Sequence, residues 1–254
     1  MPRLVYHMFA ARDRGRRAEQ QDAVNSSFPE LQKDLGVLCV LSDGMGGLAG
    51  GREASQIVVE TMVSAFHRSS IGDTPEQILL RGVSLSQKAV RSLQGTSGES
   101  GATLVAALIR EDRCSFLSVG DSRIYLFRNG GLIHLNRPQT KGARIDLMIG
   151  MGRMPEEART DSNRAGLTGY IGMENLERVD RSSHSFPVIP GDRILLMSDG
   201  VFGSLSEEEI AAAAALPEEA VCNSLIWQTM QKGIEGQDNC SAALISCLPA
   251  AGWT

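Results

Sequence analysis

Three short apolar runs in this sequence end in the same way, with an aspartate in a turn. Residues 37–41 lead into Ser42-Asp43-Gly44, residues 116–119 into Gly120-Asp121-Ser122, and residues 194–197 into Ser198-Asp199-Gly200. Short, partly β-branched apolar runs bounded by Gly, Asp or Asn are typical of strands. A single Asp-Gly pair is an ordinary turn signal. The repetition instead predicts several strands that end on carboxylates.

Two more acids extend this pattern. Asp238 precedes the last apolar run, and Asp22 begins an early candidate strand. If these strand ends converge, the carboxylates cannot all stay ionised without a cation, because like charges a few ångströms apart repel. The four histidines are not paired at ligand spacing, and oxygen ligands favour Mg²⁺ or Mn²⁺ over zinc. The glycine after Asp43 allows a sharp turn, so the Gly44 carbonyl is a further candidate ligand.

A metal pair held by carboxylates suits the hydrolysis of phosphate esters, because the cations activate water and stabilise the attacking and leaving oxygens. Such a site also needs a cation for the remaining phosphate oxygens. The arginine-rich stretch at residues 12–17 lies just before Asp22, and one arginine there would bind phosphate through two hydrogen bonds. The other arginines of the stretch are expected to form a solvated basic turn.

The order of the elements predicts an α+β fold in one domain over residues 1–254. Strands are expected at residues 36–41, 114–119, 124–127, 193–197 and 242–248. Two helices between the first two strands follow from apolar stripes at near i+4 spacing. The first stripe comprises Ala54, Val58, Met62, Ala65 and Phe66, and the second comprises Leu79, Val83, Val90 and Leu93. Two more helices are expected, from Ser206 to about Ala215 and from Leu216 to about Gln231.

Residues 139–167 differ from the rest of the chain, because they are rich in glycine and charge and have little periodicity. We expect a mobile excursion with one short helix at about residues 155–159. Long excursions in compact domains often serve as lids or binding loops.

Composition excludes several classes of protein. The formal net charge of −5 does not suit a nucleic-acid-binding surface. The five cysteines include no CxxC pair, as expected for free thiols in a reducing cytosol. The N-terminal residues do not resemble a signal peptide, and no apolar run reaches the roughly 20 residues that span a bilayer. A cytoplasmic protein without membrane contact is therefore expected.

With these motifs in order along the chain, the sequence resembles the protein phosphatase 2C family of metal-dependent serine/threonine phosphatases, in particular its compact bacterial members. The matching segments are Arg14 to Asp22, Ser42-Asp43-Gly44-Met45-Gly46-Gly47 with Ala54-Ser55, Ser100 to Leu104, Val119 to Arg123, Ser198 to Val201, and Gln237 to Ser241. The resemblance implies a four-layer αββα sandwich of two antiparallel sheets flanked by helices, with residues 139–167 as a flap subdomain. It also implies hydrolysis of phosphoserine and phosphothreonine on proteins by a water that bridges two metal ions.

By the same resemblance, Asp43 would bridge both metals and Gly44 would add its carbonyl. Asp199 and Asp238 would complete the first metal, and Asp22 would act through bound water or by supporting a ligand. Arg17 would bind the phosphate, and Asp121 would hold a weaker third ion. Phosphoproteins, a cognate serine/threonine kinase and a monomeric state are the expected partners and assembly.

The sequence departs from the family pattern at three places. Gln21 replaces an acid, Met45 stands where some eukaryotic members carry a histidine, and residues 135–140 replace the usual Thr-x-Asp-His-Ser stretch. None of the implied metal ligands is lost.

Two other functions compete with that of a phosphatase. Residues 44–49 fit the GxGxxA pattern of dinucleotide-binding proteins, but Asp43 would repel a pyrophosphate, and a second helix follows instead of a strand. The second alternative is a catalytically inactive phosphatase-like module that binds a partner. Its weakness is that such a module has no reason to keep mutually repelling acids.

Overall fold

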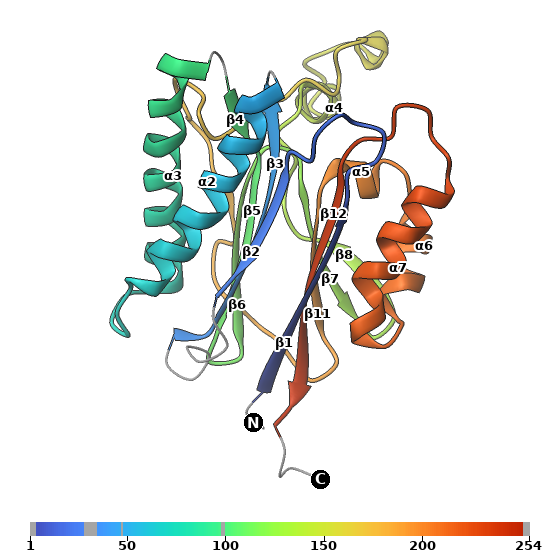
Figure 1. The fold of residues 1–254 in the computed structure, drawn as a ribbon. Coiled ribbons are helices and arrows are strands. Elements are labelled where there is room, and N and C mark those ends of the chain that lie inside the picture. The colour runs from blue at the N-terminus through green and yellow to red at the C-terminus, as the bar shows by residue number, and fades with distance from the viewer. Residues whose placement is uncertain (1–3, 28–34, 47, 98–99, 251–254) are drawn as a thin grey trace.

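The computed structural model describes residues 4–27, 35–46, 48–97 and 100–250 of the chain. Two antiparallel sheets pack face to face, and each is covered on its outer face by helices (Figure 1). Helices α2 (Leu48–His67) and α3 (Pro75–Ser97) cover one sheet, and α6 (Glu207–Ala214) and α7 (Glu218–Gln231) cover the other. The expected α+β class and αββα sandwich are confirmed.

The first sheet has the strand order β1-β12-β11-β7-β8. Its strands are β1 (Leu4–Asp13), β12 (Cys240–Pro249), β11 (Arg193–Met197), β7 (Arg123–Arg128) and β8 (Gly131–His134). The second sheet follows the order β10-β6-β5-β3-β2, with β4 paired to β3 and β9 paired to β6. Its strands are β10 (Phe186–Pro187), β6 (Arg113–Val119), β5 (Leu104–Arg110), β3 (Val37–Gly46), β2 (Asp22–Ser26), β4 (Ser100–Ala102) and β9 (Asp180–Arg181).

Strand β3 shows how the central strands join the layers. Val37, Cys39 and Leu41 pack between the two sheets, whereas Leu38 and Val40 pack against α2 and α3. Side chains alternate across a strand, so a strand buried on both faces must be apolar throughout. This explains the continuous apolar runs of the sequence.

The helices follow their predicted patterns. The apolar stripe of α2 is buried against the second sheet, as are Leu79, Val83 and Val90 of α3. Thr74 and Gln77 form a reciprocal capping box before α3, in which each side chain accepts a hydrogen bond from the backbone N–H of the other. Ser206 and Glu209 form the same arrangement at the start of α6. None of the helices in the described ranges has the length and apolar character needed to cross a membrane.

The segment 139–167 contains more regular structure than expected. Besides the short 3₁₀ helix η2 (Glu156–Thr160), it forms α4 (Lys141–Gly150), which was not predicted. The Thr140 hydroxyl accepts a hydrogen bond from Ala143 N and caps α4. Asp146 on α4 pairs with Arg159 and Arg164, which joins the two helices. Gly47 of the second sequence motif lies outside the described residues.

Candidate metal centre

The aspartates predicted from the sequence gather at one edge of the sandwich, opposite the chain termini (Figure 1). Asp22 and Asp43 are directly opposite each other in the β2–β3 ladder. Asp199 begins α5 (Asp199–Phe202) after β11, Asp121 follows β6, and Asp238 precedes β12. Both sheets therefore contribute acids to the same region, because their strands end there.

The electrostatics of these acids show how closely they interact. Burial, followed by the charges of Asp22 and Asp199, raises the pKa of Asp43 well above its usual value. Burial and the charge of Asp238 also raise the pKa of Asp199. Burial raises the pKa of Asp22 to about 6 and, together with the charge of Asp199, that of Asp121 to about 6. The four carboxylates cannot all be ionised at low cost without a compensating cation.

Their oxygen atoms fit a hard divalent cation. Oδ1 of Asp22 and Oδ1 of Asp199 are buried, and neither has a hydrogen-bond partner among the described residues. Buried carboxylate oxygens without donors are costly unless a metal or a proton satisfies them. Oxygen donors alone are the ligand set that Mg²⁺ and Mn²⁺ prefer. In the described ranges, however, no group of three or more His, Cys, Asp or Glu side chains is arranged so that it could hold a metal ion as it stands. The strands thus bring the acids close to one another, but they do not arrange the side chains as a ligand set.

The raised pKa values predict how the metal-free protein responds to pH. Asp22 and Asp121 have an ordinary pKa of 3.8 and a folded-state pKa of about 6. Their contribution to stability is therefore fully present below pH 4 and is lost as pH rises through 6. With EDTA, we expect the melting temperature to fall between pH 5 and pH 7.5 by at least about 2–4 °C, the shift for about 1 kcal/mol in a chain of this size.

Mn²⁺ should raise the melting temperature more at pH 7.5 than at pH 5, because ionised carboxylates bind it more tightly. Differential scanning fluorimetry across this pH range checks both results. The double variant Asp22→Asn/Asp121→Asn should lose part of the pH dependence, and Asp43 and Asp199, whose pKa values are also raised, account for the rest. Equal pH dependence in the variant would contradict the assignment to these two acids.

Thr103 connects Asp43 to the loop that carries Asp121. Its hydroxyl accepts a hydrogen bond from Asp43 N at 3.0 Å and lies 2.8 Å from the Ser122 hydroxyl. Its backbone N–H donates to the Asp43 carbonyl at 2.8 Å, and its own carbonyl accepts from the Ser42 hydroxyl at 2.6 Å. Thr103 belongs to a sequence motif that does not reveal its role. The role follows from the fold, in which β3 and the β4–β5 segment lie side by side.

Replacing Thr103 by valine is expected to lower Mn²⁺ affinity and turnover roughly tenfold, because outer residues that orient metal ligands typically contribute this much. The variant also leaves the buried Asp43 N–H without its acceptor, at a cost of about 1–3 kcal/mol. Thr103→Ser keeps the hydroxyl and should retain most of both. Ser118→Ala is the matched control, since this neighbouring buried hydroxyl has no hydrogen-bond partner within the described part of the chain. A Ser118→Ala loss as large as that of Thr103→Val would contradict the role of Thr103.

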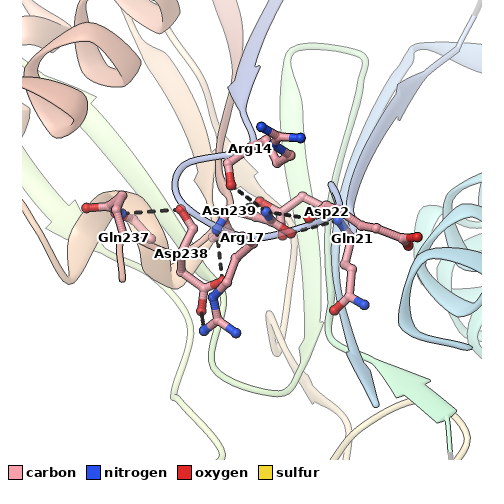
Figure 2. Close-up of polar contacts among 10 residues, drawn as sticks. Arg14, Arg17, Gln21, Asp22, Gln237, Asp238 and Asn239 are labelled. Carbon is pink, nitrogen blue, oxygen red and sulfur yellow. Dashed lines mark hydrogen bonds and ion pairs between the residues drawn. The ribbon is translucent and has the colours of Figure 1, made fainter. Parts of the chain in front are cut away.

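The segment from Arg14 to Gln21 is fastened to the residues around Asp238 (Figure 2). The Asn239 side chain donates to the Arg14 and Glu19 carbonyls at 2.8 and 2.9 Å, and it accepts from Gln21 N at 2.7 Å. Arg17 Nη2 donates to Asp238 Oδ2 at 2.6 Å. The structure therefore brings Arg17 beside a predicted metal ligand, and Asn239 fixes the backbone that carries it.

The hydroxyl of Ser198 forms hydrogen bonds with both Asp22 and Ser241. Ser198 Oγ donates to Asp22 Oδ2 at 2.8 Å and accepts from Ser241 N at 2.9 Å. Because Ser198 immediately precedes Asp199, one hydroxyl ties together the ends of β2, β11 and β12. Its position in the Ser-Asp-Gly motif was the only sequence signal for this role.

The departure at residues 135–140 has a structural function of its own. The buried Asn136 side chain accepts from Ile124 N at 2.7 Å and donates to the Ser122 carbonyl at 2.9 Å. Gln139 exchanges hydrogen bonds with the backbone of Gly120 at 2.8 and 3.2 Å. These two residues fix both sides of the Asp121 loop, a role that sequence reasoning did not identify.

The cysteines take no part in this chemistry. All five are free and buried, and burial raises the pKa of Cys39, Cys222, Cys240 and Cys247 to about 12. A protonated, inaccessible thiol is not a nucleophile at neutral pH.

A two-sheet sandwich with a carboxylate cluster at one edge and an arginine beside it is the arrangement expected of a metal-dependent phosphoesterase. The family model described as protein phosphatase 2C matches residues 12–234. The chain belongs to the protein phosphatase 2C family, as its motifs indicated.

Named relatives agree with this family. The serine/threonine protein phosphatase PstP of Mycobacterium tuberculosis is 31% identical over 245 residues, which cover 93% of this chain and 44% of PstP. This chain thus spans less than half the length of that relative. The serine/threonine phosphatase stp of Listeria monocytogenes is 25% identical over 245 residues, covering 92% of each protein.

Solved structures share the fold. The serine/threonine phosphatase of S. agalactiae superimposes with a TM-score of 0.83 and 25% identity, covering 95% of this chain and 99% of that one. The catalytic domain of PstP in complex with two manganese ions superimposes with a TM-score of 0.75 and 29% identity, covering 97% of this chain and all of that one.

Proposed function

We propose that this protein hydrolyses phosphoserine and phosphothreonine on other proteins in a reaction that depends on Mn²⁺ or Mg²⁺. The observation that carries the proposal is the convergence of one buried and three half-buried aspartates with raised pKa values beside an arginine. Acids in this arrangement need a cation, and a cation beside a phosphate-binding arginine suits phosphoester hydrolysis. The family and the phosphatase names of the relatives support the same reaction.

Asp43, Asp199 and Asp238 would hold the two metal ions, together with the Gly44 carbonyl. Asp43 lies in the centre of the cluster, where the charges of Asp22, Asp199, Asp121 and Asp238 all act on it, which suits a bridging ligand. Asp121 would hold a third ion. When bound, the divalent cations lower the pKa of water for attack on phosphorus and neutralise charge on the phosphate. The complex of PstP with two manganese ions supports this pair of cations.

Arg17 would bind the phosphate oxygens. A guanidinium has five N–H donors in a rigid plane, and a single bond to Asp238 leaves donors for the substrate. The contact with Asp238 also keeps the charge of Arg17 at the site before substrate arrives. Asp22, oriented by Ser198, would accept hydrogen bonds from water at the site through its second oxygen.

Hydrolysis of p-nitrophenyl phosphate and of a phosphothreonine peptide, with Mn²⁺ or with EDTA, tests the proposal. We expect turnover of both substrates with Mn²⁺ and none with EDTA. Metal binding by calorimetry without any turnover would contradict the proposal and would favour the inactive binding module.

Arg17→Ala is expected to raise KM for a neutral phosphopeptide with a smaller change in kcat. A charge-assisted hydrogen bond contributes about 1.5–3 kcal/mol, so kcat/KM should fall roughly 10- to 100-fold. Steady-state kinetics with Arg68→Ala as control checks this, because Arg68 is an exposed arginine just beyond the far end of α2. If Arg16→Ala gave this effect and Arg17→Ala did not, Arg16 would be the phosphate-binding residue and our assignment to Arg17 would be wrong.

The remaining biological assignments belong to the same proposal. We place the substrates among phosphoproteins and expect a cognate serine/threonine kinase, because the relatives are serine/threonine phosphatases. We also propose that the protein is monomeric, with one catalytic domain over residues 1–254. A cytoplasmic location agrees with the free cysteines.

A further inference from the structure

The end of β1 and the loop between β1 and β2 together carry more positive charge than the reaction at the metal centre requires. Residues 12–19 contain four arginines and two acids, in a chain whose formal net charge is −5. One acid, Asp13, already accepts a hydrogen bond from Gly15 N at 2.8 Å. The other, Glu19, contributes its carbonyl to Asn239. The local charge of this loop is thus opposite to that of the whole chain.

Of these four arginines, only Arg17 pairs with a carboxylate in the described ranges, and the guanidinium of Arg12 donates instead to the Asp22 carbonyl at 3.4 Å. Arg14 and Arg16 are exposed, and neither forms an ion pair in the described ranges. Within the described part of the chain, the Arg14 guanidinium donates a hydrogen bond only to the Ala18 carbonyl of the same loop, at 3.4 Å. Elsewhere on the surface, Arg81, Arg128 and Arg159 are paired with carboxylates, whereas the exposed Arg68 forms no ion pair in the described ranges and is therefore a matched control.

The backbone that carries Arg14 and Arg16 is fixed to the segment that carries Asp238. Gly15 has a φ of +63°, and a Cβ there would lie 2.6 Å from the Gln237 carbonyl oxygen and closer still to that of Asp238. Arg16 N donates to the Gln237 carbonyl at 2.8 Å, and the Arg14 carbonyl is held by Asn239. The backbone on both sides of Gly15 is therefore fixed to the segment that carries Asp238.

Arg14 and Arg17 extend in different directions from this loop (Figure 2). Arg17 points onto Asp238, where the phosphate is expected, and Arg14 points away from it. Since an extended peptide advances about 3.3 Å per residue, residues two or three positions from the phosphorylated residue lie about 7–10 Å from the phosphate. Other side chains of this loop can contact those residues while Arg17 contacts the phosphate.

We propose that Arg14 and Arg16 select substrates in which acidic residues flank the phosphorylated serine or threonine. This inference rests on the proposed phosphatase function and names the class of peptide that the same site accepts. Unpaired guanidiniums held on a rigid loop bind carboxylates with little loss of conformational entropy. They also raise the encounter rate with an acidic segment.

The test uses two phosphothreonine peptides of equal length, with glutamate or glutamine at positions two and three on each side. For the natural protein with Mn²⁺, we expect kcat/KM for the glutamate peptide to exceed that for the glutamine peptide about tenfold, as two exposed ion pairs would give. The ratio should fall towards one at about 0.5 M NaCl, since exposed charges are screened. Arg14→Gln/Arg16→Gln should bring the ratio to about one at low salt, whereas Arg68→Gln should keep it.

A ratio near one in the natural protein, or an unchanged ratio in the double variant, would overturn the inference while leaving the phosphatase function intact. The salt dependence of the natural protein tests the same point without any variant. Absence of p-nitrophenyl phosphate turnover with Mn²⁺ would instead overturn the proposed function, and the inference with it.

Discussion

Replacing Asp43 by asparagine is expected to lower turnover of p-nitrophenyl phosphate by at least about 10³-fold, which corresponds to about 4 kcal/mol of transition-state stabilisation. Asp43 is the acid on which the charges of four other aspartates act, so the proposed shared metal ligand would lie there. An asparagine keeps one oxygen but loses the charge that would hold the two proposed cations together. The loss should appear mainly in kcat and in the Mn²⁺ concentration for half-maximal rate.

The same substitution should stabilise the metal-free protein at pH 7.5. Burial and neighbouring carboxylates raise the pKa of Asp43, so its ionised form destabilises the fold when no cation is present, and asparagine removes that charge. Thermal unfolding in EDTA checks this result. Asp161→Asn serves as control, because Asp161 is an exposed acid of the flap segment. Turnover within tenfold of the natural protein, or a lower melting temperature in EDTA, would contradict the central position of Asp43.

The opposite effects of Asp43→Asn on activity and stability explain why the sequence revealed this site. Acids that repel one another persist at strand ends only where a function requires them, so their repetition stands out against ordinary turns. Asp43, Asp121 and Asp199 each follow a continuous apolar run. The fold class, the αββα layers and the edge where the acids meet could therefore be predicted from local patterns together with the order of the motifs.

Strand β5 was missed although it is a continuous, buried apolar run, whereas β1 and α4 lack such local signals. Strand β1 has only two buried residues, Leu4 and Tyr6, followed by intermediate and exposed positions. The sequence of β1 therefore shows only a weak pattern of alternating apolar residues. Helix α4 contains Gly142 and buries only Gly142, Ile145 and Ile149. Glycine lowers helix propensity, and the capping contact from Thr140 is too short a signal to outweigh it.

The supporting residues of the site could not be predicted for a different reason. Thr103 bonds to Asp43, 60 positions earlier, and Asn239 bonds to Gln21, 218 positions earlier. Such pairs depend on which strands are neighbours, and this is a property of the topology. The order of the motifs predicts which residues form the site. The hydrogen bonds that orient these residues can be predicted only when the neighbours of β2, β3, β11 and β12 are known.

Gly44→Ala should damage the site through the backbone, with a melting temperature well below that of the natural protein and at least about a 10²-fold loss of turnover. A Cβ at this position would lie 2.5 Å from the carbonyl carbon of Gly51 and 2.7 Å from the carbonyl oxygen of Gln21. Both are backbone atoms, so neither can rotate away, and overpacking of this kind typically costs about 1–3 kcal/mol. The start of α2 and the end of β3 would have to move apart.

That movement acts directly on the metal centre, because Gly44 follows Asp43 and its N–H donates to the Gln21 carbonyl at 3.1 Å. A displacement of about 1 Å in catalytic geometry can lower a rate about 10²-fold. Gly150→Ala is the matched control, since no heavy atom lies within 4 Å of a Cβ there; it should keep natural stability and turnover. A melting temperature for Gly44→Ala equal to that of Gly150→Ala would show that β3 and α2 can separate freely. The close contact would then not be what holds Asp43 in place, and the position of the acid would have to depend on Thr103 alone.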